Sequence, residues 1–427
     1  MLKNTFVAKA TLKSLPAAIV LALSCGAASA GDHDTEGFHG YVRAGGGTSN
    51  HGGTQSCYGL GGVTMAYRLG NECDSFTELG YTKELAKAAN GATFVGTFWA
   101  DAYKNSSDFG DAKLGVAKAY VEAKNLPFMN GGVIWVGKRH YSRPDIHMMD
   151  MQYINMNGTG GGVDRYPLGA GTISYAVFKD NDFNSTDPAT GKVIDSPSAL
   201  RQNFLYEGLP VNTNGKLDFA ASIISAQGKD NTTHDGWQMS VFHRQAKVFG
   251  GDNTIGVQYG VGPGTGINGP CCARIGPSGS TLLGSDYTRL RIFDSAWIQP
   301  TRDFSMELVA LYQRDKNDKD GGATWTTAGM RPVYAFAENF KLQAELGVTR
   351  LKTDLAPGSQ RLTKLTIAPT ISLARDYWAR PELRLFVSYG KWNDAATKAL
   401  NAFNNSGSVY GNDTSGVSYG IHMEAWW

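Results

Sequence analysis

The sequence contains no long apolar run beyond its first thirty residues. Further along the chain, no stretch reaches the roughly eighteen consecutive apolar residues that a membrane-spanning helix needs. A helical membrane protein is therefore excluded. Because open sheets and loops would leave backbone groups unpaired in lipid, the rest of the chain is either soluble in an oxidising compartment or a closed barrel.

Excess charge of one sign and metal-binding motifs are also lacking. The formal net charge is +2, so no basic stripe points to nucleic acid as a partner. The chain has neither a Cys-x-x-Cys pair nor a His-Glu-x-x-His motif. The segment Asp145–Asp150 contains one histidine between two aspartates, but no second histidine group shows ligand spacing. We therefore expect no bound metal.

Cysteine is sparse, with five residues in 427. Cys57 and Cys73 lie in a glycine-rich region and could close a loop of about fifteen residues, which would stabilise the fold by about 3 kcal/mol. Cys271 and Cys272 are adjacent in the sequence. Because a vicinal disulfide is strained, their state stays open.

Two letter patterns typical of enzymes occur in the wrong context. Gly264–Gly269 matches a dinucleotide-binding fingerprint, but Pro263 precedes it and Pro270 follows where an apolar helix should begin. Gly416–Gly420 matches a nucleophile elbow, but its serine lies inside a strand-like stretch with no helix after it. We predict that the protein is not an enzyme and uses no cofactor.

The first thirty residues have the pattern of a secretory signal. Lys3, Lys9 and Lys13 give a basic start, Pro16–Leu23 is a short apolar run, and Ala28–Ala30 is a small-residue cleavage site. We expect residues 1–30 to be a signal peptide and residues 31–427 to form one exported domain.

What the sequence does contain is glycine, aromatic residues and period-two alternation. It has 53 Gly, 19 Tyr and 19 Phe, a composition that suits many short strands joined by turns. In residues 417–427, apolar residues alternate with mostly polar ones, and residues 289–292, 306–312 and 382–389 repeat the pattern. Polar turns separate these stretches. Repeated strands of roughly ten residues are typical of a transmembrane barrel of roughly sixteen to eighteen strands.

Eight segments carry a resemblance to a known family. They are Phe38–Arg43, Tyr67–Cys73, Ile134–Arg139, Arg143–Asp150, Met330–Tyr334, Trp378–Pro381, Tyr389–Trp392 and Met423–Trp427. Together they resemble the maltoporins, whereas residues 165–250 match poorly. The resemblance implies an all-β, 18-stranded antiparallel transmembrane β-barrel with an inward-folded third loop, a homotrimer, in the bacterial outer membrane. It also implies a disulfide between Cys57 and Cys73.

The resemblance further implies a helical path of aromatic side chains for sugars, an aromatic slide. Its positions in this chain are Tyr41, Phe76, Trp378 and Trp426. Phe109 stands where the family has Trp, on a loop that reaches into the neighbouring subunit. A sixth position falls at Ile255, which is not aromatic.

A polar track is implied opposite the slide, and strand parity gives it independent support. Tyr41 would share a strand face with Arg43, and Phe76 with Glu78. The track residues are Arg43, Arg68, Glu78, Arg143, Asp145 and Asp150.

The chain departs from the family pattern at two track positions. Gln152 stands where the family has a constriction tyrosine, and Ala117, followed by Lys118, stands where it has an arginine. Both changes remove bulk. We therefore expect a wider and less discriminating constriction.

These observations favour a channel for facilitated diffusion of maltose, maltodextrins or related oligosaccharides. A porin for sucrose or β-glucosides and a general diffusion porin without a sugar site are the alternatives. An alternative outside the channels is an enzyme or adhesin built on a barrel, but the sequence shows no catalytic constellation that favours it. Expected partners are the oligosaccharide, outer-membrane lipids and two further copies of the chain. The family resemblance adds bacteriophages that use the exposed loops as a receptor.

Overall fold

The computed structural model describes residues 34–427 except 61–65, 108, 181–183, 187–192, 196–198, 228–232, 268–274, 277–278, 320 and 404–408. The expected signal peptide and the Cys271–Cys272 pair therefore lie outside the described residues. None of the helices in the described part of the chain is long and apolar enough to cross a bilayer.

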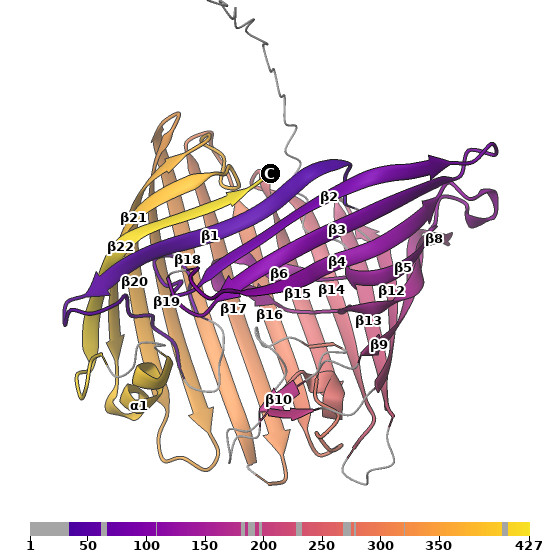
Figure 1. The fold of residues 1–427 in the computed structure, drawn as a ribbon. Helices are drawn as coiled ribbons and strands as arrows, with labels where there is room; N and C mark the ends of the chain where they lie inside the picture. Colours follow the sequence, from indigo (N-terminus) through magenta and orange to yellow (C-terminus); the bar gives the residue numbers. More distant parts are fainter. Residues whose placement is uncertain are drawn as a thin grey trace, which may run out of the picture.

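Eighteen strands of the described chain form one closed antiparallel sheet (Figure 1). Each strand pairs with the next, and the last pairs with the first, so that Tyr41 lies opposite Trp426 and Arg43 opposite Glu424. The predicted 18-stranded antiparallel barrel is confirmed. The strands are β1 (Gly37–Ser49), β2 (Ser75–Lys87), β3 (Thr93–Lys104), β4 (Lys113–Lys124), β5 (Val133–His140), β8 (Asn157–Leu168), β9 (Gly171–Asp180), β12 (Ala199–Asn212), β13 (Gly215–Ala226), β14 (Gly236–Val248), β15 (Gly251–Val261), β16 (Thr288–Ile298), β17 (Phe304–Asn317), β18 (Gly321–Ala337), β19 (Phe340–Thr353), β20 (Gln360–Ser372), β21 (Glu382–Trp392) and β22 (Ser415–Trp426).

Short elements occur only in the connections of the described chain. Among them, β6 (Asp145–Ile146), η2 (His147–Met149) and β7 (Met151–Gln152) form a small hairpin between β5 and β8. The others are η1 (Pro127–Met129), β10 (Asn184–Thr186), β11 (Val193–Asp195), η3 (Gly262–Thr265) and α1 (Asp394–Phe403).

The two ends of the barrel differ in the length of their connections. Turns such as 213–214, 249–250 and 338–339 join strands at one end, here called the short-turn rim. Connections such as 50–74 and 141–156 join strands at the other, the long-loop rim, where α1 and β10 also lie in Figure 1. Outer-membrane barrels have this asymmetry, with the short turns facing the periplasm.

The side chains alternate in the opposite sense to a soluble protein. Along β21, Leu383, Leu385 and Val387 are exposed on the outer face, whereas Arg384 and Ser388 are buried on the inner face. Burial alternates in the same way along β20. An apolar outside and a polar inside suit a barrel that has lipid around it and water within it.

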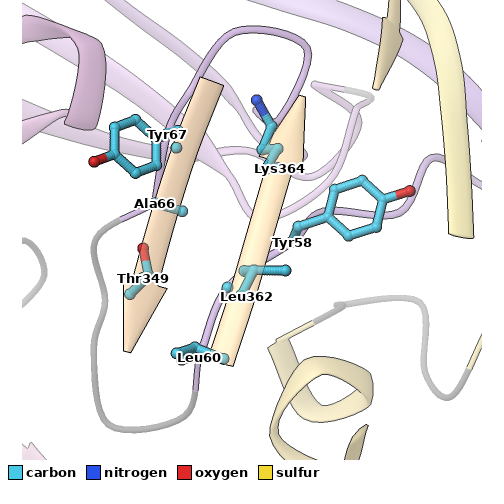
Figure 2. A pocket seen from close by; sticks show the side chains of 9 residues that line it. Tyr58, Leu60, Ala66, Tyr67, Thr349, Leu362 and Lys364 are labelled. Atoms are coloured by element: carbon cyan, nitrogen blue, oxygen red, sulfur yellow. The ribbon is translucent and has the colours of Figure 1, made fainter. Parts of the chain in front are cut away.

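The interior is filled partly by the connection between β1 and β2. Tyr67 of this connection lies against the inner wall where two glycines leave room: a Cβ on Gly347 would be 1.9 Å from the Tyr67 ring, and one on Gly329 would be 2.2 Å away. Figure 2 shows Tyr58 and Leu60 of the same connection beside β19 and β20. The described residues 55–60 and 66–73 of the connection therefore pack inside the barrel.

A disulfide joins two points of this connection. Cys57 and Cys73 are bonded, with their Cα atoms 6.1 Å apart. Because Cys73 lies two residues before β2 begins, the bond ties the connection to the barrel wall.

The inverted polarity predicts the cost of a charge on the outer face. Leu385 lies near the middle of β21 and is 59% exposed. Leu385→Arg should lower the free energy of unfolding by about 2–4 kcal/mol in phospholipid vesicles, because the guanidinium would enter lipid. Leu355→Arg, in the exposed turn after β19, is the control and should change it by less than about 0.5 kcal/mol. Equal effects of the two variants in denaturant titrations would contradict a lipid-facing Leu385.

Candidate functional site

Three aromatic rings from adjacent strands lie side by side on the inner wall. Tyr41 of β1 stacks on Trp426 of β22, with ring centroids 6.4 Å apart and planes 12° apart. Tyr41 also contacts Phe76 of β2 at 5.9 Å. Residues opposite one another in an antiparallel pair point to the same face, so the register alone brings Tyr41 and Trp426 together.

The row extends at both ends. Phe76 contacts Tyr103 at 6.5 Å between centroids. At the other end, the His147 ring lies 5.7 Å from Trp426 and 5.2 Å from Trp378. Trp378 in turn contacts Trp297 at 6.0 Å. The resulting aromatic row consists of Tyr103, Phe76, Tyr41, Trp426, His147, Trp378 and Trp297.

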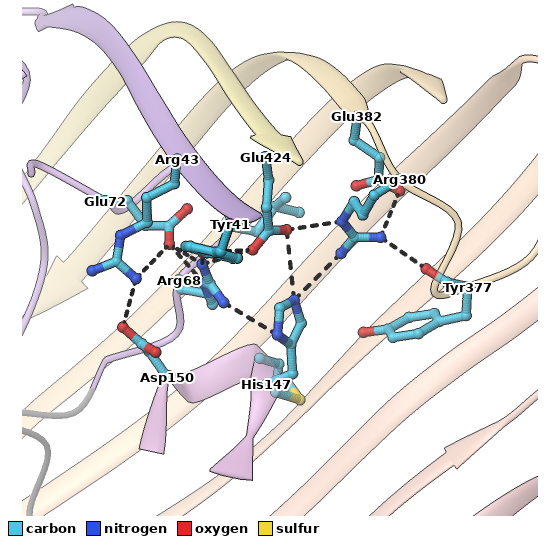
Figure 3. Close-up of polar contacts among 12 residues, drawn as sticks. Tyr41, Arg43, Arg68, Glu72, His147, Asp150, Tyr377, Arg380, Glu382 and Glu424 are labelled. Carbon is cyan, nitrogen blue, oxygen red and sulfur yellow. Dashed lines mark hydrogen bonds and ion pairs between the residues drawn. The ribbon is translucent and has the colours of Figure 1, made fainter. Parts of the chain in front are cut away.

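Charged side chains gather around the centre of this row (Figure 3). Glu424, two residues before Trp426 on β22, is fully buried. It accepts a hydrogen bond from Tyr41 Oη at 3.0 Å, and Arg380 Nε donates to it at 3.0 Å. Arg68 and Arg384 approach it at 2.9 and 2.7 Å. One carboxylate therefore holds three guanidinium groups.

A second group of charges forms around Arg43 of β1. Its Nη2 lies 2.6 Å from Asp74 Oδ2, and its Nη1 lies 2.8 Å from Asp150 Oδ2. Glu72 lies 3.6 Å from the same guanidinium and accepts a bond from Arg68 Nε at 2.7 Å. Arg68 therefore joins the Arg43 group to the Glu424 group, and together they form one charged cluster.

The aromatic row and the charged cluster are in direct contact. Arg380 lies over the Trp426 ring, 4.2 Å from its centroid. His147 has Arg68 at 3.2 Å from Nδ1 and Arg380 at 3.3 Å from Nε2. Flat apolar faces and strong hydrogen-bonding groups are therefore adjacent on the inner wall.

Inner-wall residues from distant strands hold the two connections that supply Arg68 and His147. Glu345 of β19 accepts the Leu69 N–H at 3.1 Å, and Lys364 of β20 donates to the Leu69 carbonyl at 2.6 Å. Glu307 of β17 accepts the Met148 N–H at 3.1 Å. Because these anchors bond to the backbone beside Arg68 and His147, they position both side chains.

The arginines keep one carboxylate of each connection, Glu72 and Asp150, ionised. Burial opposes ionisation of Glu72, but Arg68, His422 and Arg43 outweigh it and lower the pKa of Glu72 to about 2. Burial likewise opposes ionisation of Asp150, and Arg43 and Arg68 lower its pKa below the usual value. Both carboxylates are therefore charged at neutral pH.

The structure brings most of the expected residues together. Of the slide residues, Tyr41, Phe76, Trp378 and Trp426 lie in the row, and Arg43, Arg68 and Asp150 of the track lie in the cluster. Glu78 lies opposite Tyr41 and is 3.6 Å from Arg143.

The remaining expected residues lie beside this site or away from it. Asp145 and Gln152 are cross-strand partners in the hairpin between β5 and β8, and Asn155 donates to Gln152 at 2.9 Å. Phe109 lies in the β3–β4 connection, and among the described ring contacts it has none with the row. Ala117 lies at a β-bulge, where Lys118 stacks on Trp99 at 4.0 Å.

The prediction of a sixth slide position at Ile255 is wrong. Ile255 is exposed on the outer face of β15 together with Val257 and Tyr259, so it faces away from the lumen. Trp297, on the neighbouring strand β16, extends the row instead.

Sequence reasoning missed Trp297, Tyr103, His147, Glu424 and Arg380. Parity would have found two of them: Trp297 shares a strand face with Arg289 and Arg291, and Glu424 shares one with Trp426. His147 and Arg380 lie in connections, where alternation gives no signal.

The closed barrel with an apolar exterior and a charged, aromatic interior defines an outer-membrane channel. Residues 37–427 match the family model of the LamB porins, and the chain belongs to this family.

The chain is also similar to several solved structures. OccK10 (OpdN) of Pseudomonas aeruginosa is 8% identical over 92% of this chain and 99% of its own, with a TM-score of 0.51. OpdK of Pseudomonas aeruginosa, crystallised with vanillate, is 10% identical over 91% and 98%, with a TM-score of 0.48. An anion-selective porin of Comamonas acidovorans is 14% identical over 91% and 98%, with a TM-score of 0.46.

The lowered pKa of Glu72 predicts a pH-dependent contribution to stability. Its folded pKa of about 2 is below the ordinary value of 4.5, so the stabilisation is present above pH 4.5 and is lost as pH falls through 2. Glu72→Gln should lower the free energy of unfolding by roughly 3 kcal/mol at pH 7 and by almost nothing at pH 2.

Denaturant titrations of both proteins at the two pH values measure this difference. Glu84→Gln, at an exposed position of β2, is the matched control and should have little effect at either pH. A Glu72 effect of the same size at pH 7 and pH 2 would show that the ion pairs do not stabilise the fold.

Proposed function

We propose that the channel carries oligosaccharides by facilitated diffusion along the aromatic row, with the charged cluster exchanging hydrogen bonds with the sugar hydroxyls. The observation that carries this proposal is the contiguity of the row: each of its seven rings lies 5.2 to 6.5 Å from the next. A sugar moving along such a row leaves one ring only when the next is within reach.

The chemistry of a sugar ring matches both halves of the site. Its apolar C–H face stacks on an aromatic ring, which contributes about 0.5–1.5 kcal/mol beyond burial. Its hydroxyls exchange hydrogen bonds with groups such as Arg43 and Asp150, and charged partners make these bonds stronger. The total should stay at about 4–8 kcal/mol, because tighter binding would prevent release.

Glucose-based oligosaccharides, namely maltose and maltodextrins, are the proposed substrates, on the basis of family membership. A porin for sucrose or β-glucosides uses the same chemistry and is the alternative within this class. A general diffusion porin would need no aromatic row, so the row favours a sugar site. We extend the proposal to a homotrimer in the outer membrane.

We also propose that the hairpin at Asp145–Gln152 forms the constriction. Met148 bonds to Glu307 on β17, and Asp150 bonds to Arg43 on β1. β17 and β1 are far apart around the barrel, so the hairpin reaches both walls. The charged face of the hairpin then borders the path that the sugar takes.

Adjacent tryptophans at the end of β22 provide a test of the row. Trp426 belongs to the row, whereas Trp427 is 37% exposed and contacts Phe38 outside it. Trp426→Ala should weaken maltohexaose binding by about tenfold, measured as sugar block of ion current in a planar bilayer. Trp427→Ala removes the same bulk and should change the affinity by less than about twofold.

Equal affinities for the two variants would count against the row as a sugar path. Heat modifiability on gels checks that both variants form barrels before the currents are compared.

The expectation of a wide constriction at Gln152 predicts the effect of placing a tyrosine there. Gln152→Tyr adds a stacking face and bulk at the hairpin, so single-channel conductance should fall and maltohexaose affinity should rise by about threefold to tenfold. Gln152→Asn, which keeps the amide, is the control. Unchanged conductance and affinity in Gln152→Tyr would remove this position from the constriction.

A further inference from the structure

The outer surface of β17 to β21 carries a band of cations at the long-loop rim. Each of these side chains occupies an outward position of its strand, alternating with buried inward residues. We call this band the basic belt. Its members are Arg314, Lys316, Arg350, Lys352, Arg361 and Lys391.

On β17, β19 and β21, the belt begins where the apolar band of the strand ends. On β19, the outward residues are apolar up to Val348 and basic at Arg350 and Lys352. On β21, outward Tyr389 is followed by outward Lys391. Tyrosines at the edge of an apolar band mark the level of the lipid headgroups, so the belt lies at that level.

The cations of the belt are close to one another and have little compensating charge. Arg350 and Arg361 are direct cross-strand partners, an arrangement in which like charges destabilise a sheet. Among the described residues, the ion pair that the belt forms is between Arg314 and Asp354, with atoms 2.9 Å apart. An anion between the strands would remove this repulsion.

The opposite rim of the same strands is arranged differently. There Arg302 pairs with Glu338 at 3.0 Å, and Arg375 lies 3.1 Å from Glu338 and 2.5 Å from Asp303. Cations at the short-turn rim are therefore matched by carboxylates of the chain itself. Among the described residues of these strands, the outward cations without an ion pair lie at the long-loop rim, which is the side facing away from the periplasm.

We propose that the basic belt binds the phosphate groups of an anionic lipid headgroup in the outer leaflet. The belt fits a lipid because its cations adjoin the apolar band that faces the acyl chains, whereas a soluble anion would need no such neighbour. The inference rests on the outer-membrane location of the barrel, and it is independent of the proposed sugar path inside.

Binding of lipid A to the purified, folded protein in detergent micelles tests the belt. The probes are lipid A with both phosphates and the same lipid with its phosphates removed, compared by native mass spectrometry. Wild type should prefer the phosphorylated form. The triple variant Arg350→Gln, Lys352→Gln, Arg361→Gln should bind it roughly a hundredfold more weakly, because each cation near an anionic surface contributes about fivefold.

Two matched variants separate charge from fold. Lys83→Gln, Lys87→Gln, Lys216→Gln removes three exposed cations nearer the short-turn rim and should bind like wild type. Arg350→Lys, Arg361→Lys keeps the charge and should remain within about threefold of wild type.

Two results would overturn the proposal. One is equal binding of both lipids, or equal binding by wild type and the belt triple variant. The other is displacement of lipid A by inorganic phosphate alone at about 10 mM, a Kd range typical of weak ion binding, which would make the belt a soluble-anion site. Because the lumen is unchanged in these variants, sugar block of their currents reports separately on the proposed function.

Discussion

Pairing of the backbone in lipid is the constraint on which the rest of this structure depends. A strand that lies in hydrocarbon must have every N–H and C=O group bonded to a neighbouring strand, so the sheet has to close, as β22 does on β1. Closure then assigns alternate side chains of each strand to lipid and to the lumen. Apolar residues such as Leu385 and Ile421 lie outside, and charged residues such as Arg384 and Glu424 lie inside.

A lumen lined by so many charges needs internal compensation. The arginines of the cluster form ion pairs with carboxylates at hydrogen-bonding distance. Glu424 alone pairs with Arg68, Arg380 and Arg384. Removing one partner of such a buried pair is costly, because it leaves the other charge uncompensated. The network therefore fixes the connection of Arg68 and the hairpin of His147 in place, and with them the part of the lumen where the aromatic row runs.

The strand pattern was predictable from the sequence, whereas the contacts between connections and wall were not. Alternation in residues 382–389 and 417–427 correctly assigned inner and outer faces, and parity placed Tyr41 beside Arg43. Parity is a local property of a strand, so it needs no knowledge of the rest of the barrel.

The bonds of Leu69 to Glu345 and of Met148 to Glu307 join residues 276 and 159 positions apart, and they form only because the closed barrel brings these residues together. His147 and Arg380 lie in such connections, which is why sequence reasoning missed them. The prediction for Ile255 was wrong because the resemblance is poor in residues 165–250, directly before β15, whereas strand parity puts Ile255 on the outer face with Val257 and Tyr259.

We propose that the aromatic row and the charged cluster together form a sugar path. The most direct test of this proposal is the ion conductance of the purified, refolded protein in a planar lipid bilayer, with maltohexaose, sucrose and cellobiose titrated in turn. If the row and the cluster form a sugar path, at least one of these sugars blocks the current saturably and reversibly. A steady current that none of the three sugars blocks would contradict the proposal and leave a general diffusion channel.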